Sequence, residues 1–138
     1  MGLSDDPQTI SDEDARSLLQ RSQQAWHDRD LEAIAGVLAP DVRVEFNFAE
    51  PVDGIAAARV WLQDRFDTQL GYRLNKQLRG VYGSTIVSHW TGTWRDSHDE
   101  DYRAVGIELL TVGSNGLITH WEAVMCSQSR HVADEPAR

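Results

Sequence analysis

The chain has 138 residues, of which 41% are hydrophobic and 25% charged, values typical of one folded globular domain rather than of a disordered chain. Its 13 basic and 22 acidic residues give a net charge of -9, which argues against nucleic acid and anionic membrane surfaces as partners. Cys126 is the only cysteine, so an intramolecular disulfide and a cysteine-based zinc cluster are excluded.

Two further features of the chain predict a cytoplasmic location. The first residues lack a basic segment followed by an apolar run, and no stretch approaches the roughly 20 apolar residues of a membrane span. We expect a flexible N-terminal segment over residues 1–10, a single domain over 11–126 and a polar C-terminal tail over 127–138.

The first part of the chain predicts two helices. Ser11, with Asp14 three residues later, is typical of a helix N-terminal cap and predicts a helix over about 11–28. Asp30 can cap a second, short helix, which Pro40 should end because proline cannot continue the hydrogen-bond ladder. The apolar residues of the second helix are Leu31, Ile34, Ala35 and Leu38.

A strand and a third helix are predicted next. Residues 42–48 alternate between apolar and polar side chains, which indicates a half-buried strand. Its apolar face would carry Val42, Val44, Phe46 and Phe48. Pro51 and Gly54 interrupt the pattern, and residues 55–69 return to a helical period.

The rest of the chain reads as a meander of strands over 73–82, 85–94, 102–112 and 117–126. Short polar or glycine-containing turns separate them. Helices followed by antiparallel strands give an α+β order, and a long meander twists and curls. We therefore expect a cone-like, curved antiparallel or mixed sheet backed by three N-terminal helices.

Aromatic residues dominate one face of the predicted strands and contribute from two helices. The predicted wall of an inner pocket is Trp26, Phe46, Phe48, Trp61, Trp90, Trp94, Trp121 and Met125. Glycine and alanine residues among them leave room, which suits a cavity on the order of a few hundred cubic ångströms. The alternative is that these rings pack into a solid core.

Glu108 is an acidic residue on an otherwise apolar strand face. A buried carboxyl group is costly in its charged form, so such a group is favoured as a neutral acid or finds a partner. An inward acid can serve as a general acid or hydrogen-bond donor, and Tyr102 and Ser88 would be further donors. The alternative is a structural pair with an inward arginine or tyrosine.

Three stretches of the chain resemble the SnoaL-like proteins of the nuclear transport factor 2-like superfamily. The first is Ala-Trp-His-Asp-Arg-Asp-Leu-Glu-Ala-Ile at 25–34, followed by Leu-Ala-Pro-Asp-Val at 38–42. The second is Gly54, followed by Leu-Gly-Tyr-Arg-Leu-Asn-Lys-Gln-Leu at 70–78. The third is Gly-Ile-Glu-Leu-Leu at 106–110, followed by Gly-Leu-Ile-Thr-His-Trp-Glu-Ala at 116–123. The second and third are most similar to an uncharacterised SnoaL-like subgroup. The resemblance implies the helix-backed cone, a fold that hosts isomerases, cyclases, dehydratases, epoxide hydrolases and non-enzymes.

The resemblance also gives Glu108 a counterpart. Against ketosteroid isomerase it falls on the protonated aspartic acid of the oxyanion hole, a group kept neutral by its apolar site. The other two functional positions of that enzyme fall on Ser22, in place of the donor tyrosine, and on Phe46, in place of the base. A different base would therefore be needed here.

Other candidate groups are interpreted as surface features. Lys76, the only lysine, limits Schiff-base chemistry to one residue, and we interpret it as a surface lysine. His120 and Glu122 share one strand face and could hold a metal ion, but no third ligand is visible, so we expect no metal. No phosphate-binding loop or nucleophile motif is found, and we expect no cofactor.

The opposite strand face is also apolar and would carry Val105, Ile107, Leu109, Ile118 and Val124. Apolar patches of this kind mark protein contacts, and we expect a homodimer through the outer sheet face, as is common in the superfamily.

The sequence is compatible with three functions. The first is an acid–base enzyme of isomerase, cyclase or dehydratase type acting on an apolar organic substrate. The second is a non-catalytic binder of a small ligand, and the third is a dimeric scaffold with a filled cone.

Overall fold

The computed structural model describes residues 9–129, and it has three helices on one side of a six-stranded sheet. The elements are α1 (Asp12–His27), α2 (Leu31–Ala35), β1 (Leu38–Phe46), β2 (Val52–Asp53), α3 (Ile55–Thr68), β3 (Leu70–Tyr82), β4 (Thr85–Arg95), β5 (Asp101–Val112) and β6 (Ile118–Ser129). The strand order is β2-β1-β6-β5-β4-β3. Only the β1–β6 pair is parallel among the described strands, so the sheet is mixed.

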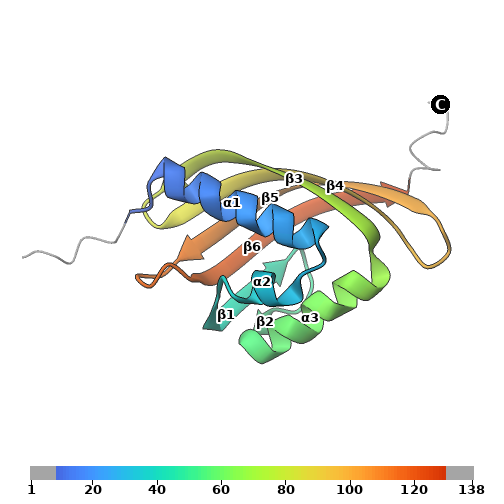
Figure 1. Cartoon of the computed structure of the whole chain (residues 1–138), viewed down its shortest axis with the longest axis horizontal. Helices are drawn as coiled ribbons and strands as arrows, with labels where there is room; N and C mark the ends of the chain where they lie inside the picture. Colours follow the sequence, from blue (N-terminus) through green and yellow to red (C-terminus); the bar gives the residue numbers. More distant parts are fainter. Residues whose placement is uncertain (1–8, 130–138) are drawn as a thin grey trace, which may run out of the picture.

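The long strands curve, and the helices cover the concave face of the sheet, as Figure 1 shows. The sheet is not closed into a barrel, because its edge strands β2 and β3 do not pair with each other. The expected α+β architecture, a curved mixed sheet backed by three helices, is confirmed.

Helix α1 begins where its capping signal predicts. The Ser11 hydroxyl oxygen accepts a hydrogen bond from the backbone N–H of Asp14 at 3.0 Å. This cap satisfies one of the backbone donors that the first turn of a helix leaves free. The buried face of the helix consists of Ala15, Leu18, Leu19, Ser22, Ala25 and Trp26.

The prediction that Pro40 ends the second helix is wrong. Helix α2 ends earlier, with Gly36 as its C-terminal cap, and both Leu38 and Pro40 belong to strand β1. The pairing of β1 with β6 shifts register between Leu38 and Arg43. Pro40 lies in this irregular stretch, where the missing backbone N–H of proline interrupts no regular hydrogen bond between the strands. The short strand β2 was not predicted.

Phe48 is a second correction, because it does not lie on the inner wall. Strand β1 ends at Phe46, and Asn47 adopts a left-handed conformation with a φ of 49°. This turn breaks the alternation of side chains, so Phe48 is fully exposed. Asn47 also bonds both backbone groups of Met125 with its side-chain amide, at 3.1 and 2.8 Å.

The four predicted strands of the meander are confirmed as β3 to β6. Their inner face is the predicted one along β4 and β5, where every second residue from Ile86 to Trp90 and from Ala104 to Leu110 is buried. Ile118 is the exception, because the β5–β6 register shifts between Thr111 and Val112 and turns it inward. It therefore does not belong to the outer patch.

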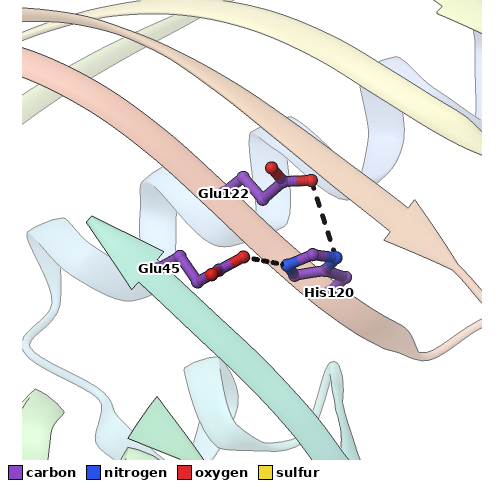
Figure 2. A group of neighbouring side chains, drawn as sticks. All are labelled: Glu45, His120 and Glu122. Carbon is purple, nitrogen blue, oxygen red and sulfur yellow. Dashed lines mark hydrogen bonds and ion pairs between the residues drawn. The ribbon is translucent and has the colours of Figure 1, made fainter. Parts of the chain in front are cut away.

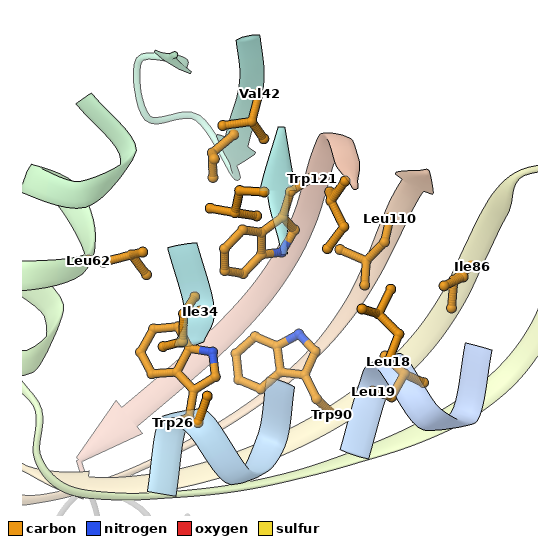
Figure 3. Close-up of a cluster of buried hydrophobic side chains, with 14 of the residues drawn as sticks. Leu18, Leu19, Trp26, Ile34, Val42, Leu62, Ile86, Trp90, Leu110 and Trp121 are labelled. Carbon is orange, nitrogen blue, oxygen red and sulfur yellow. The ribbon is translucent and has the colours of Figure 1, made fainter. Parts of the chain in front are cut away.

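The core lies between the sheet and the helices. Figure 3 shows Trp26, Trp90 and Trp121 gathered in this layer with aliphatic side chains from α1, α2 and α3. Among the described residues no helix is both long and apolar enough to cross a membrane. The location in the cytoplasm stays a prediction.

The predicted terminal segments are only partly covered. Residues 1–8 and 130–138 lie outside the described residues. Strand β6 continues to Ser129, so residues 127–129 of the predicted tail are part of the sheet.

Candidate functional site

A pocket lies in the concave side of the sheet, between the strands and helices α1 and α3. The cavity itself is about 40 Å³, and the space between its lining atoms reaches about 430 Å³ only when the open mouth is included. Its lining residues are Trp26, Phe46, Trp61, Arg65, Gln69, Tyr72, Leu74, Lys76, Trp90, Glu108, Trp121 and Met125. Of the eleven side chains that the sequence predicted there, seven are brought together in this wall, and Phe48, Trp94, Tyr102 and Ser88 are not.

The charged part of this wall is a buried ion pair. The Nζ atom of Lys76 lies 2.9 Å from Oε2 and 3.2 Å from Oε1 of Glu108. Both side chains are nearly inaccessible, with exposed fractions of 4% and 2%. The indole N–H of Trp121 donates a hydrogen bond to Oε1 at 3.1 Å. The carboxylate is thus held by a cation on one side and a neutral donor on the other.

Oε2 of Glu108 has a close cation but poor hydrogen-bond alignment. It has no aligned hydrogen-bond donor among the described residues, although Lys76 Nζ is only 2.9 Å away. The short distance makes the ion pair the better description of this contact, since Coulomb attraction depends on distance and not on alignment. One lone pair of Oε2 therefore remains available to a ligand.

Strand pairing explains how Lys76 reaches Glu108. Lys76 is the pairing partner of Trp90, and Glu108 is the partner of Ser88, two residues from Trp90 on β4. The lysine side chain thus crosses β4 diagonally over the concave face. The small side chain of Ser88 leaves space for this crossing.

Helix α1 fixes the segment of β3 that carries the lysine. The backbone N–H of Lys76 donates to Oε1 of Gln23 at 2.7 Å, and the His27 ring bonds the backbone of Leu74 at 2.8 to 2.9 Å. These contacts join residues about fifty positions apart along the chain. They hold the backbone of β3 against α1, and thus hold the base of the Lys76 side chain in place.

Aromatic rings form the rest of the wall. Trp121, Trp61 and Phe46 contact one another at ring-centroid distances of 5.1 to 5.5 Å, with edge-to-face or tilted geometry. Trp90 lies directly over Gly106, where an added Cβ would meet the indole at 2.6 Å. Gly106 is therefore required for Trp90 to lie flat against the sheet.

Tyr72 and Arg65 complete the pocket. Burial raises the pKa of Tyr72, the negative charge of Glu108 raises it further, and the positive charge of Arg65 partly opposes both. Tyr72 is therefore a neutral hydroxyl near physiological pH and can donate to a ligand. The guanidinium of Arg65 lies over the ring of Trp61, 5.0 Å from its centroid.

Two predicted residues lie outside the pocket. Trp94 stacks between Tyr72 and Tyr102 with nearly parallel rings. Desolvation raises the pKa of Tyr102, and so do the negative charge of Asp96 and the hydrogen bond between the phenol and that carboxylate. The Tyr102 hydroxyl therefore already has a hydrogen-bond partner. Trp94 and Tyr102 instead line a separate surface groove with Arg73 and Arg95.

Ser88 is fully buried but does not line the pocket. Its hydroxyl oxygen has no hydrogen-bond partner among the described residues. The predicted roles of Tyr102 and Ser88 as donors to a substrate in this pocket are therefore not supported by their positions.

The interpretation of Lys76 as a surface residue is wrong. Leu74, Lys76 and Leu78 alternate along β3, and Leu74 is buried, so Lys76 shares the inner face. The alternation of Leu74, Lys76 and Leu78 is visible in the sequence and indicates that all three side chains share one face of the strand. The positions of Arg65, Gln69 and Tyr72 could not be read from the sequence, because they depend on the approach of α3 and β3 to the sheet.

A second group of ionisable side chains lies on the outer face of the sheet. Figure 2 shows His120 between Glu45 and Glu122, with ring nitrogen to carboxylate distances of 2.5 Å and 3.5 Å. Glu45 is the third group that the sequence did not reveal, and the parallel pairing of β1 with β6 brings it there. One ligand atom from each of the three side chains lies within 4.8 Å of the other two, so the group could hold a metal ion.

The chain is similar to proteins of known fold. The model of the SnoaL-like domain matches residues 19–121. None of the curated proteins matches the chain.

Three solved structures illustrate the structural similarity. A proposed ketosteroid isomerase from Kribbella flavida is 23% identical, with a TM-score of 0.66 and coverage of 91% of this chain and 84% of that one. The epoxide hydrolase/cyclase-like enzyme SalBIII, which has a role in pyran ring formation in the polyether salinomycin, is 12% identical, with a TM-score of 0.75 and coverage of 84% and 93%. RV0760c from Mycobacterium tuberculosis, in complex with estradiol-17beta-hemisuccinate, is 15% identical, with a TM-score of 0.71 and coverage of 82% and 98%.

Proposed function

Because the chain belongs to the SnoaL-like domain family, we propose that it binds a small, largely apolar organic molecule in the concave pocket and acts on it by acid–base chemistry. The reaction would be of isomerase, cyclase or dehydratase type. The observation that carries the proposal is the buried Lys76–Glu108 pair in an otherwise aromatic wall.

The pair can supply both functions that proton transfer needs. Glu108 can accept a proton from a carbon or oxygen atom of the substrate through Oε2, whose alignment leaves a lone pair free. Lys76 can stabilise or protonate the oxygen on which negative charge develops. The indole N–H of Trp121 fixes the carboxylate at Oε1, so the reacting oxygen keeps one orientation. No cofactor is required for such a step.

The family resemblance to ketosteroid isomerase supports only part of this mechanism. Phe46 falls at the position of the base of that enzyme, and its hydrocarbon side chain, which packs against Trp61, has no group that could accept a proton. In the proposed reaction Glu108 takes the role of base, and not that of a protonated donor, because its carboxylate is paired with the ammonium group of Lys76. The chemistry would therefore be different although the fold is shared.

The solved structures support an apolar ligand. RV0760c holds a steroid derivative, and SalBIII takes part in ring formation of a polyether. The six aromatic residues in the wall of this pocket would contact a ligand of similar character.

Non-catalytic binding is the second candidate function, and one observation favours it. Lys76 and Glu108 neutralise each other, as in a structural ion pair that only orients a ligand. A dimeric scaffold with a largely filled cone is the third candidate, because the cavity itself is only about 40 Å³.

An isotope-exchange assay tests the proposal without knowledge of the natural substrate. The probe is 2-indanone, a small apolar ketone with exchangeable hydrogens next to its carbonyl group. We expect the protein to quench its tryptophan fluorescence on binding and to accelerate exchange of these hydrogens in D2O, followed by proton NMR. Glu108→Gln should retain binding and lose the acceleration.

Two other results would separate the candidates. Binding with no acceleration above the buffer rate would favour the non-catalytic binder. Absence of binding by 2-indanone and by apolar probes of similar size would contradict the proposed pocket. Glu32→Gln, at an exposed ion pair, is the matched control and should behave as the unchanged protein.

A further inference from the structure

From the position of the only lysine, we infer that the pocket takes aldehydes or ketones and that Lys76 forms a covalent imine with them. This inference rests on the proposed function, because it assigns the substrate class and a covalent step to the same pocket. It starts from the contrast between one lysine and twelve arginines in the chain. An arginine at position 76 would serve equally well as a cation for Glu108, but it cannot form an imine.

The surroundings of Nζ favour nucleophilic use of the amine. Lys76 lies in an aromatic wall with Trp90 as its pairing partner and the Trp121 ring 5.7 Å from Nζ. Glu108 Oε2, 2.9 Å from Nζ, is a proton acceptor inside the same wall. The apolar wall also limits access of the bulk water that would hydrolyse an imine.

Glu108 can carry the protons that imine formation requires. It first takes one proton from the ammonium group across the 2.9 Å contact to Oε2 and leaves a neutral amine. The nitrogen lone pair then forms a bond to the carbonyl carbon. Glu108 gives its proton to the carbonyl oxygen and takes one proton from the newly bonded nitrogen, which leaves a neutral carbinolamine and a protonated Glu108. Glu108 returns its proton to the carbinolamine oxygen, the C–O bond breaks, and water leaves.

The reaction is balanced without an oxidant or reductant. The ammonium group and the carbonyl compound give a protonated imine and one water molecule, and Glu108 is again a carboxylate at the end. Trp121 keeps its hydrogen bond on Oε1 throughout, so Oε2 is the oxygen that moves the proton. The Tyr72 hydroxyl, neutral near physiological pH, is placed in the same wall to donate to the carbonyl oxygen.

Reductive trapping tests the inference directly. The protein is incubated with benzaldehyde and sodium cyanoborohydride, which reduces an imine to a stable secondary amine, and digested peptides are analysed by mass spectrometry. We expect Lys76 to be labelled at least about tenfold faster than an exposed lysine, since the pocket holds amine and aldehyde together. The exposed reference is the double variant Lys76→Arg and Arg79→Lys, which moves the single lysine to an exposed position on the same strand.

A competition experiment on the unchanged protein protects the test against variants that fail to fold, and two single variants complete it. Ethylbenzene, which matches benzaldehyde in shape but has no carbonyl group, should slow the labelling of Lys76 by occupying the pocket. Glu108→Gln should slow labelling, because no group then removes the ammonium proton, whereas Glu32→Gln should leave it unchanged.

The outcomes distinguish this inference from the proposed function. If benzaldehyde quenches tryptophan fluorescence but Lys76 is labelled no faster than the exposed reference, imine formation is wrong and the binding pocket stands. If neither benzaldehyde nor ethylbenzene binds, the inference and the proposed function both fail.

Discussion

At the scale of single residues, the Lys76–Glu108 pair is the least expected feature of the molecule. Removing two charges from water costs several kcal/mol per ion, and attraction between them offsets this cost only with good geometry. The pair satisfies that condition with two contacts to Nζ and one to the Trp121 indole. Such a pair adds little to stability, so its presence in an aromatic wall is better explained by function.

Substitutions at the pair should be strongly non-additive. Lys76→Met and Glu108→Leu each leave one buried charge without a partner, and we expect each to lower the free energy of unfolding by about 3–5 kcal/mol. The double variant should be more stable than either single variant, because it buries no charge. Urea denaturation followed by circular dichroism measures all four proteins.

The control for this cycle is the exposed pair of Arg59 and Glu32, where the pKa of Glu32 is lowered mainly by its hydrogen bond to Arg59. Removing either partner there should change stability much less, since solvent screens exposed pairs. Additive effects at positions 76 and 108 would contradict the buried ion pair.

Tyr72 should make stability depend on pH in the alkaline range. Burial, and then the charge of Glu108, raise its pKa above the value of about 10 for an unfolded tyrosine. The folded protein therefore keeps a proton that the unfolded chain releases. This contribution is complete below about pH 10 and is lost as pH rises through the folded pKa.

The variant Tyr72→Phe tests this pH dependence. Urea unfolding between about pH 9 and 11 should show a smaller loss of stability for Tyr72→Phe than for the unchanged protein. Tyr82→Phe removes an exposed phenol and should leave the loss in place. Equal curves for Tyr72→Phe and the unchanged protein would show that Tyr72 is not buried beside a negative charge.

At the scale of elements, alternation along the strands predicted most of the site. It placed Trp90, Glu108 and Trp121 on the concave face, where the structure has them. It failed at irregular points, such as Phe48 after the left-handed Asn47, and Ile118 after a register shift. Alternation cannot anticipate these points, because they depend on how neighbouring strands pair.

Long-range contacts set a second limit on what the sequence could predict. The Lys76–Glu108 pair needs β3, β4 and β5 in register, and the Glu45–His120 contact needs β1 beside β6. A parallel pair between strands at opposite ends of the chain has no local signal. The fold class was predictable from element order, whereas the partners of individual residues were not.

The packing of Trp90 on Gly106 gives a prediction for β4 and β5. In Gly106→Ala the new methyl group would lie 2.6 Å from the indole, so Trp90 must move into the pocket. We expect a loss of stability of about 1–3 kcal/mol, a shift of tryptophan emission and weaker binding of 2-indanone. Fluorescence and urea denaturation measure these changes.

Gly80→Ala is the matched control, because nothing lies within 4 Å of the added Cβ atom there. It should have little effect on emission or binding. Normal binding by Gly106→Ala would mean that Trp90 does not form the wall of the pocket.

At the scale of the whole molecule, the outer sheet face remains to be explained. Val105, Ile107 and Val124 are exposed there by 46%, 39% and 62%. We predict that this face forms a homodimer and that Val124→Asp, which places a charge in the apolar patch, weakens it. Light scattering after gel filtration at micromolar concentration should give the mass of two chains for the unchanged protein and a lower mass for the variant.

Val60→Asp changes an equally exposed valine on α3, away from the sheet, and should leave the dimer intact. A mass of one chain for the unchanged protein would contradict the predicted dimer. That result would leave the pocket and its ion pair unaffected, since both lie on the opposite face of the sheet.

The proposed chemistry requires that the single lysine lies in the aromatic pocket, paired with Glu108 and in contact with the ligand. NMR of protein labelled with 15N only at the ε position of lysine tests it most directly, because the spectrum contains one signal. We expect a signal that is protected from exchange with water, is displaced by Glu108→Gln and is displaced again by 2-indanone. A signal that exchanges as fast as that of free lysine, and that neither change affects, would contradict it.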